Sequence, residues 1–321
     1  MYPTHRARRL RNNSTIRSLV RETAVERSHL IYPVFISAVV KDQTPIDAMP
    51  GVFECSVSRA VEEVTNLFEK GLRYFLLFGV PDHKDDRASG AYEEKGVVQT
   101  AIRRIKASVP NAIIFTDVCL CAYTDHGHCG VVRDGKIHND DSVALLARSA
   151  LSHAQAGADF VAPSDMMDGR VKEIRRVLDE HGFEDVGILS YAAKFASAFY
   201  GPFREAAHSA PQFGDRKSHQ MDPANRREAL KEMQLDVEEG ADMIMVKPAL
   251  SYLDIIREAA DRFLVPIVAY NVSGEYSIIK AAAQKGWIDE RQVRDEVLLS
   301  MRRAGADIII TYFAKDIVLE E

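Results

Sequence analysis

The stretch EEGADMIMVKPA, residues 238–249, contains the joint on which the fold depends. It has Gly-Ala-Asp between the end of a helical pattern and a short apolar run. The same joint recurs in QAGADF (155–160) and RRAGAD (302–307). Glycine commonly follows the last turn of a helix, and the apolar run after it is typical of a strand. Three similar joints therefore predict one repeated β/α unit.

Short apolar runs of this kind recur along the whole chain. Each is rich in Val, Ile, Phe and Tyr and is continuous rather than alternating, as expected of a parallel strand buried on both faces. The eight runs are LIYPVFI (30–36), YFLLFGV (74–80), AIIFTDV (112–118), FVAPSD (160–165), VGILSYA (186–192), MIMVKP (243–248), PIVAYNVS (266–273) and IIITYF (308–313). Helical patterns separate most of them, for example residues 58–71 and 141–157. This alternation predicts an α/β fold, a (β/α)8 TIM barrel of roughly 250 residues.

An open, doubly wound sheet is the alternative architecture for such a pattern. The chain has no G-x-G-x-x-G at the start of its first helix and no P-loop. Both motifs are usual in doubly wound folds that bind nucleotides. The barrel is therefore the favoured fold.

Composition limits the class of protein. The 321 residues are 46% hydrophobic and 27% charged, enough for one large domain or two average ones. The net charge of -6 gives no reason to expect nucleic acid or an anionic membrane as a partner. No apolar run approaches the ~20 residues that span a bilayer. Four cysteines, three of them clustered, suggest metal binding in a reducing compartment rather than a disulfide scaffold. We expect a cytoplasmic protein, with a plastid or another organelle left open.

The first 29 residues differ in charge from the rest of the chain. They hold seven arginines against two acids, a charge of +5, which leaves -11 for the remainder. No apolar segment of a secretory signal follows. We expect residues 1–29 to form an N-terminal extended arm on an acidic neighbouring subunit, and residues 30–321 to form the catalytic barrel. A transit peptide and a solvated tail are the alternatives.

Reactive and polar side chains follow the predicted strands. In (β/α)8 barrels the chemistry lies at the carboxyl ends of the strands. The residues expected there are Asp117, Cys119, Cys121, Ser164, Asp165, Lys194, Lys247, Tyr270, Ser273 and Tyr312. Their number at one end of the barrel favours a catalytic site.

Two of these residues are lysines with apolar neighbours in sequence. Burial or a nearby cation lowers the pKa of a lysine from about 10.4. A neutral amine can then attack a ketone and form a Schiff base. Lys194 and Lys247, on adjacent predicted strands, are therefore expected to be catalytic. The alternative is that each pairs with a carboxylate such as Asp117 or Asp165.

Three cysteines have the spacing C-x-C-x7-C, at Cys119, Cys121 and Cys129. Thiolates bind soft or borderline metals, and zinc is the usual one. Three protein ligands with an open fourth position are typical of catalytic zinc. His128, or less directly His126, could instead close the site.

A long connection follows the fifth predicted strand, at about residues 200–225. Loops of this length in a compact barrel are usually lids or binding loops. Arg204, Arg216 and Lys217 lie on it and could clamp a carboxylate. Solvated surface charge is the alternative.

Several blocks together resemble the porphobilinogen synthase family, also called 5-aminolevulinate dehydratase. They are DVCLCAYTDHGHCG (117–130), VAPSDMMDGR (161–170), SYAAKFASAFYGPFREAA (190–207), GDRKSHQMDPAN (214–225), GADMIMVKPA (240–249) and VSGEY (272–276). The resemblance implies a barrel whose arm embraces a neighbour in a homo-octamer. It also implies the condensation of two 5-aminolevulinate molecules to porphobilinogen, with loss of two waters, in tetrapyrrole biosynthesis. No organic cofactor is implied.

The resemblance also implies roles for individual residues. Lys194 and Lys247 match the Schiff-base lysines, and the three cysteines match the zinc-type subgroup. The substrate contacts matched are Arg204, Arg216, Gln220, Ser273 and Tyr312, and we add Lys217 and Tyr270 to them. Asp117, Ser164 and Asp165 match polar groups around the lysines, and Glu232 matches the ligand of an allosteric magnesium. The chain departs from common family patterns at Ala122, Ser218 and Ala249, and Ser218 puts a second, thiolate-bound zinc in doubt.

Two other functions compete with this interpretation. A class I aldolase also uses a Schiff-base lysine on a barrel strand, but it explains neither the second lysine nor the three cysteines. A non-catalytic zinc-binding barrel explains the cysteines and leaves both lysines without a role.

Overall fold

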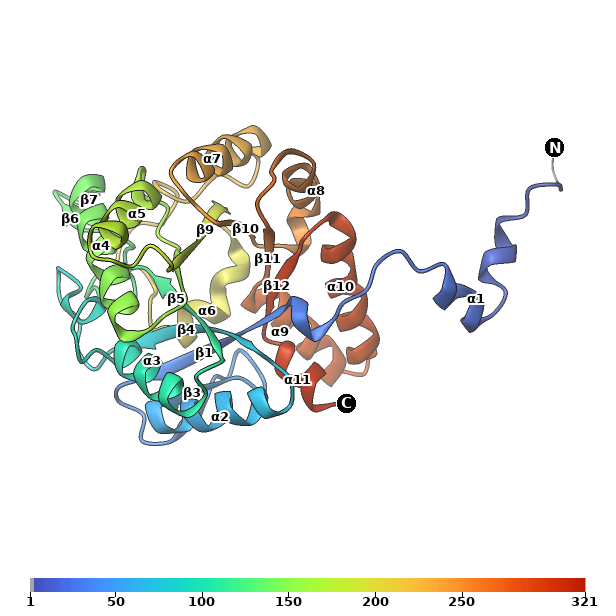
Figure 1. The fold of residues 1–321 in the computed structure, drawn as a ribbon, viewed down its shortest axis with the longest axis horizontal. Coiled ribbons are helices and arrows are strands. Elements are labelled where there is room, and N and C mark those ends of the chain that lie inside the picture. The colour runs from blue at the N-terminus through green and yellow to red at the C-terminus, as the bar shows by residue number, and fades with distance from the viewer. Residues whose placement is uncertain (1–2, 321) are drawn as a thin grey trace.

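Eight parallel strands close into a barrel in the computed structural model, which describes residues 3–320 (Figure 1). The strands are β1 (Leu30–Ser37), β4 (Tyr74–Val80), β5 (Ile113–Val118), β8 (Phe160–Pro163), β9 (Gly187–Lys194), β10 (Met243–Lys247), β11 (Ile267–Asn271) and β12 (Ile308–Thr311). Each neighbours the next in this order, and β12 pairs with β1 through Leu30 and Ile309 to close the ring. Each predicted apolar run coincides with one barrel strand, so the predicted (β/α)8 fold is confirmed.

Helices cover the outside of the barrel (Figure 1). They are α2 (Val57–Glu69), α3 (Val97–Ser108), α4 (Asn139–Ala156), α5 (Arg170–Glu180), α7 (Arg226–Glu238), α8 (Leu253–Arg262), α9 (Ser273–Gln284), α10 (Glu290–Ala304) and α11 (Ala314–Leu319). The inner face of α2 shows why they pack there: Ala60, Val64 and Leu67 repeat at helical spacing and are buried. The helices predicted at 58–71 and 141–157 correspond to α2 and α4.

The three Gly-Ala-Asp joints have the same structure. Gly157, Gly240 and Gly305 have φ values of 102°, 105° and 118°, a left-handed conformation that ends or follows a helix at little cost for glycine. The aspartates of the joints then accept hydrogen bonds from the first residues of the neighbouring strands: Asp159 from Ile114 N–H (2.6 Å), Asp242 from Ile188 N–H (2.7 Å) and Asp307 from Ile267 N–H (2.9 Å). Each joint therefore stops a helix and anchors the amino end of an adjacent strand.

Smaller elements lie around the barrel. β2 (Gln43–Pro45) and β3 (Phe53–Ser56) extend the sheet beside β1, and β6 (Val132–Arg133) and β7 (Lys136–Ile137) form a hairpin after the third cysteine. The connection after β9 contains η4 (Ala198–Tyr200) and α6 (Gly201–Ala206); two further short turns are η3 (Ser89–Ala91) and η5 (Leu250–Tyr252). None of these small elements was predicted individually.

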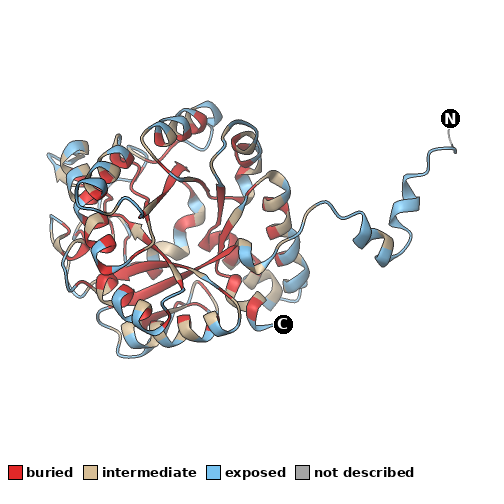
Figure 2. Cartoon of the chain, viewed as in Figure 1, coloured by how far each residue is buried: buried red, intermediate tan, exposed pale blue. Residues whose placement is uncertain are grey.

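The described part of the arm extends away from the barrel (Figures 1 and 2). It contains η1 (Ala7–Arg11), α1 (Ser14–Leu19) and η2 (Arg27–His29), none of which has a buried residue. Residues 1–2 of the predicted arm and residue 321 of the predicted barrel domain lie outside the described residues. The role of the arm in oligomer contacts stays a prediction. Within residues 3–320, no helix has the length and apolar character needed to cross a bilayer.

Candidate active site

Lys194 and Lys247 lie side by side at the carboxyl end of the barrel. β9 and β10 are parallel neighbours, and the last positions at which they pair are these two lysines. The residues are 5% and 4% exposed, so both amines are removed from bulk water. The barrel thus brings together the two side chains that the sequence predicts to be catalytic.

Aromatic rings surround the amino group of Lys247. Measured from Nζ to the ring centroids, they are Tyr270 (4.2 Å), Tyr191 (4.9 Å), Phe203 (5.0 Å) and Tyr200 (5.4 Å). Burial first, and the positive charge of Lys194 second, lower the pKa of Lys247 to about 7. Near neutral pH about half of these amines are therefore neutral and nucleophilic.

The amino group of Lys194 has a different environment. Its Nζ donates a hydrogen bond to the backbone carbonyl of Ser164, in the loop after β8. The ring of Tyr191 lies 5.5 Å from the same atom. Ser164 is 3% exposed, and the atom of this residue that contacts Lys194 is its backbone carbonyl oxygen.

Asp117 is the carboxylate that electrostatically couples to both lysines. Its Oδ1 is buried and has no hydrogen-bond partner in the protein. Burial raises the pKa of Asp117 to about 6, although the positive charges of Lys194 and Lys247 oppose the rise. A carboxyl with this pKa can exchange a proton near neutral pH.

Asp165 lies in the loop after β8 and is fully buried. One of its oxygens accepts a hydrogen bond from Met167 N–H at 2.7 Å, and the other lies 3.8 Å from Nε of Arg170. Burial raises the pKa of Asp165, and the charge of Arg170 opposes that rise. Arg170 also pairs with Asp236 on α7 at 3.1 Å. Its guanidinium therefore links Asp165 to a helix outside the barrel.

The three predicted cysteines converge after β5. Their Sγ atoms all lie within 4.8 Å of one another, and those of Cys119 and Cys121 are 3.3 Å apart. Sulfurs around a tetrahedral zinc ion, each at about 2.3 Å from it, are about 3.8 Å apart. Hydrogen bonds from the other two thiols lower the pKa of Cys129 well below its usual value, and the same contacts raise the pKa of Cys119, so the thiolate of the cluster is favoured at Cys129. All three residues are buried, and the geometry fits one metal ion.

The two histidines of the same loop do not join this cluster. Nε2 of His128 lies 3.0 Å from the carbonyl oxygen of Phe213, and Nδ1 of His126 accepts a hydrogen bond from His128 N–H at 3.1 Å. Among residues 3–320, the group able to hold one metal ion consists of the three cysteines alone. The histidines therefore pack against the lid segment, and neither belongs to the three-cysteine group.

Arg216 and Arg204 come from the long connection. Arg216 is 5% exposed, and its Nη2 donates to Gly127 O at 2.8 Å and to Ser209 O. Burial opposes charge on Arg216, but the Cys129 cluster raises its pKa above the usual value. Burial, and then the charge of Arg216, lowers the pKa of Arg204. Two neighbouring, partly desolvated cations of this kind favour an anionic ligand between them.

Further polar groups line the same end of the barrel. Gln220 is 3% exposed, and neither atom of its amide has a hydrogen-bond partner in the protein. Ser273 accepts a hydrogen bond from Phe203 N–H at 3.0 Å, and the hydroxyls of Tyr270 and Tyr312 are 3.1 Å apart. These groups can receive polar atoms of a ligand.

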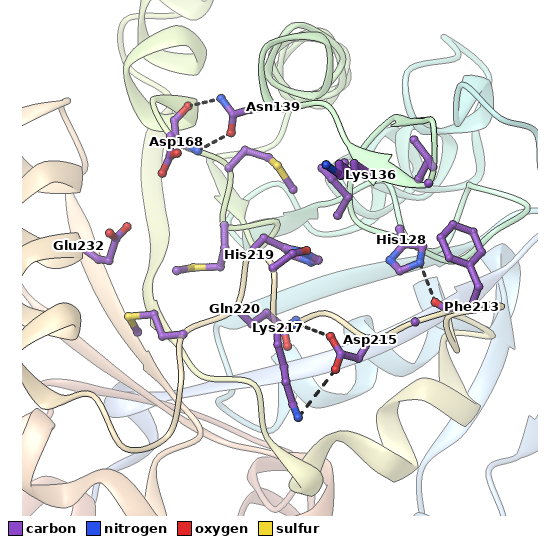
Figure 3. A pocket seen from close by; sticks show the side chains of 18 of the residues that line it. His128, Lys136, Asn139, Asp168, Phe213, Asp215, Lys217, His219, Gln220 and Glu232 are labelled. Carbon is purple, nitrogen blue, oxygen red and sulfur yellow. Dashed lines mark hydrogen bonds and ion pairs between the residues drawn. The ribbon is translucent and has the colours of Figure 1, made fainter.

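Lys217 and Glu232 lie apart from the lysine pair. Both line an outer pocket of about 690 Å³, together with Gln220, and neither Lys194 nor Lys247 is among the described residues that line it (Figure 3). The side chain of Lys217 is 77% exposed and lies 3.8 Å from Asp215. Burial, and then the nearby Asp236, raises the pKa of Glu232. The role of Lys217 at a substrate and that of Glu232 at magnesium stay predictions.

Some side chains of the site were missed from the sequence. Tyr191, Tyr200 and Phe203 surround the lysines, and Arg170 contacts Asp165. The motif around Lys194 offered one usable signal: five aromatic residues within nine positions of the lysine, in a segment poor in charge. Arg170 offered none, because it follows a glycine at the start of a helix and resembles any surface arginine.

Comparison with known proteins gives a consistent result. Residues 4–319 match the family described as delta-aminolevulinic acid dehydratase. The curated delta-aminolevulinic acid dehydratase of Halalkalibacterium halodurans is 57% identical, over 97% of this chain and 95% of that protein. The one from Bacillus subtilis is 54% identical, over 97% of this chain and 96% of that protein.

A solved structure agrees with these relatives. The delta-aminolevulinic acid dehydratase (porphobilinogen synthase) of Toxoplasma gondii superposes with a TM-score of 0.96 at 45% identity. The match covers 98% of this chain and 91% of that one. That structure was solved in complex with the reaction product porphobilinogen.

Proposed function

The chain belongs to the delta-aminolevulinic acid dehydratase (porphobilinogen synthase) family, and on that premise we propose that it condenses two 5-aminolevulinate molecules through Schiff bases on Lys194 and Lys247. The product is porphobilinogen, and two waters are released. The observation that carries the proposal is the pairing of Lys194 with Lys247 across β9 and β10, at the buried end of the barrel. Porphobilinogen in the Toxoplasma gondii relative supports the same substrate class.

The lysines suit ketone chemistry. 5-Aminolevulinate carries a ketone, an amine and a carboxylate. A neutral amine adds to the ketone, and loss of water with uptake of one proton leaves an iminium that can accept electrons during carbon–carbon bond formation. The pKa of about 7 at Lys247 supplies the neutral amine near neutral pH.

The carboxylates of the site suit proton transfer. Asp117, with a pKa of about 6, can give or take a proton beside both lysines. Asp165 has one oxygen held by Met167 and the other near Arg170, which favours a role in holding the Lys194 side of the site in place. Ser164 helps through the carbonyl that accepts a hydrogen bond from Lys194.

The polar groups around the lysines suit the substrate carboxylates. Arg204, Arg216 and Gln220 would bind one carboxylate from the lid side. Ser273 and Tyr312 would bind the other, with Tyr270 beside them. A lid at residues 200–225 would exclude water from the iminium, because an iminium exposed to water is hydrolysed back to the ketone.

The cysteine cluster suits zinc. Cys119, Cys121 and Cys129 would hold the ion as thiolates and leave one position free. A zinc ion held there would supply Lewis-acid chemistry toward an oxygen or amine of one substrate. The metal is proposed as zinc because three sulfur ligands favour it over magnesium or calcium.

Further proposals rest on the family and on the composition of the chain. We expect magnesium near Glu232 as an allosteric ion, a homo-octamer built from dimers whose arms embrace, and a location in the cytoplasm. 5-Aminolevulinate is the expected partner, and nucleic acid and membranes are not.

The rival functions fit less well. A class I aldolase needs one Schiff-base lysine and gives no reason for Lys194 to lie opposite Lys247. A zinc-storing barrel gives no reason for the low pKa of Lys247. Incubation with 5-aminolevulinate and colorimetric detection of a pyrrole separates the three. Porphobilinogen supports the proposal, and its absence in the zinc-loaded protein would reopen the rivals.

A further inference from the structure

Tyr191 lies on β9 three residues before Lys194, a spacing that normally puts two side chains on opposite faces of a strand. The pairing of β9 with β10 explains why the side chains of Tyr191 and Lys194 face the same way here. Ser190 pairs with Ile244 and Ala193 pairs with Val246, so β9 has one residue more than β10 between these positions. A bulge of this kind re-aims the side chains that follow it.

The direction of the Ser190 side chain agrees with a bulge in β9 after this residue. Its hydroxyl donates a hydrogen bond to Asp236 on α7 at 2.6 Å, so it faces the helices outside the barrel. Tyr191, the next residue, therefore faces inward. Past the bulge Lys194 faces inward as well.

The consequence is one ring shared by two amines. The centroid of Tyr191 lies 5.5 Å from Nζ of Lys194 and 4.9 Å from Nζ of Lys247. Both distances lie within the roughly 6 Å over which a cation is attracted to an aromatic face. Three other rings lie around Nζ of Lys247. Within residues 3–320, Tyr191 is the ring that lies near the amino groups of both lysines.

The hydroxyl of Tyr191 is buried and lies near the carboxyl of Asp117, and the ring packs edge-on against Tyr270 with centroids 6.3 Å apart. Burial, and then the charge of Asp117, raises the pKa of Tyr191 well above its usual value. The phenol is therefore neutral at working pH and presents an uncharged π face.

We propose that Tyr191 is a positioning residue shared by the two lysines, whose ring stabilises positive charge at Nζ of both Lys194 and Lys247. The inference rests on the proposed function. Each iminium forms when a neutral amine adds to a ketone, takes up one proton and loses one water, so one positive charge appears at each Nζ. A single ring facing both atoms favours both iminium ions at once.

Graded fluorination tests the ring without changing its size. Tyr191 is replaced by Phe and by mono-, di- and trifluorophenylalanine in the full-length, zinc-loaded protein. Each fluorine weakens the π face. After incubation with 5-aminolevulinate and borohydride, the rate of adduct formation at each lysine is read by peptide mass spectrometry. We expect Phe to stay within a few-fold of wild type, and the rates at both lysines to fall together, at least tenfold across the series.

Phe203 is the matched control, because its ring lies 5.0 Å from Nζ of Lys247 and, within the described chain, makes no such contact with Lys194. Fluorination there should slow the adduct at Lys247 alone. A series at position 191 that slows one lysine only, or neither, overturns the proposal. Complete loss with Tyr191→Phe also overturns it, because the hydroxyl would then be the active group. Absence of any adduct in the wild type rejects the proposed function itself.

Discussion

Lys194 and Lys247 are partners in the pairing of β9 with β10, so their backbones are fixed opposite each other by the barrel itself. Their amino groups share a buried space with the ring of Tyr191 and the carboxylate of Asp117. Burial of the site, and then the positive charge of Lys194, lower the pKa of Lys247.

The pH dependence of adduct formation should report the pKa of Lys247. An amine with the reference pKa would be neutral in only roughly 1 in 2,500 molecules at pH 7. With a pKa of about 7, half of the Lys247 amines are neutral there. The rate of adduct formation at Lys247 should therefore rise with pH up to about 7 and then level off. A rate that keeps rising to pH 10 would contradict the lowered pKa.

Removing the charge of Lys194 should shift the pH dependence of adduct formation at Lys247. Lys194→Met deletes the cation that helps to lower the pKa of Lys247, so that pKa should rise. The acid limb of borohydride-trapped adduct formation at Lys247 should then shift to higher pH. Mass spectrometry of the Lys247 peptide measures it even if turnover is lost. An unchanged limb would mean that burial alone sets the pKa.

The cysteine cluster should hold the metal. Cys129→Ser should lower metal affinity at least tenfold and abolish most activity, because one thiolate ligand is lost. Elemental analysis after dialysis measures the bound zinc. Cys55→Ser is the matched control: Cys55 is also buried, but its Sγ lies 3.7 Å from Glu63. Equal loss of zinc in both variants would contradict the site.

The lid arginine should matter for substrate binding. Arg216→Ala removes a buried charge and its hydrogen bonds to Gly127 and Ser209. A hydrogen bond from a charged group to a substrate carboxylate contributes about 1.5–3 kcal/mol, so loss of that contact should lower kcat/KM by about tenfold to a hundredfold. Steady-state kinetics with 5-aminolevulinate measure it. Arg226→Ala, an arginine 58% exposed and paired with Glu258, should behave like wild type. Wild-type kinetics in Arg216→Ala would contradict a role for Arg216 in binding a substrate carboxylate.

The ion pair behind Asp165 should matter for stability. Arg170 is 2% exposed and lies 3.1 Å from Asp236. Arg170→Met leaves buried carboxylates without their cation and should lower the free energy of unfolding by about 3–5 kcal/mol. Arg176→Met, at an exposed ion pair with Glu173, should cost about 0–1 kcal/mol. Urea unfolding midpoints compare the two, and similar shifts would contradict the expectation.

Most of the fold could be predicted because it rests on local signals. Continuous apolar runs identified the eight strands, and Gly-Ala-Asp identified the joints. The structure adds the reason for the aspartate: Asp159, Asp242 and Asp307 each accept a backbone hydrogen bond from a neighbouring strand. That contact joins residues 40 to 54 positions apart, as between Asp307 and Ile267, so no local pattern reveals it.

The candidate site could be predicted less completely. Lysines and cysteines at strand ends are visible in the sequence, because the barrel topology alone brings strand ends together. The inward direction of Tyr191 depends on a bulge in β9, which is a property of the pairing with β10. The path from Asp165 through Arg170 to Asp236 depends on packing between α5, α7 and the barrel. Neither can be inferred from spacing along the chain.

The central claim is that both lysines form Schiff bases with substrate. Its most direct measurement is borohydride reduction of the zinc-loaded protein with 5-aminolevulinate, followed by peptide mass spectrometry. The account predicts covalent adducts on the peptides that contain Lys194 and Lys247, and none on that of Lys217, which lies 77% exposed outside the pair. Active enzyme that makes porphobilinogen but yields no adduct at either lysine would contradict it.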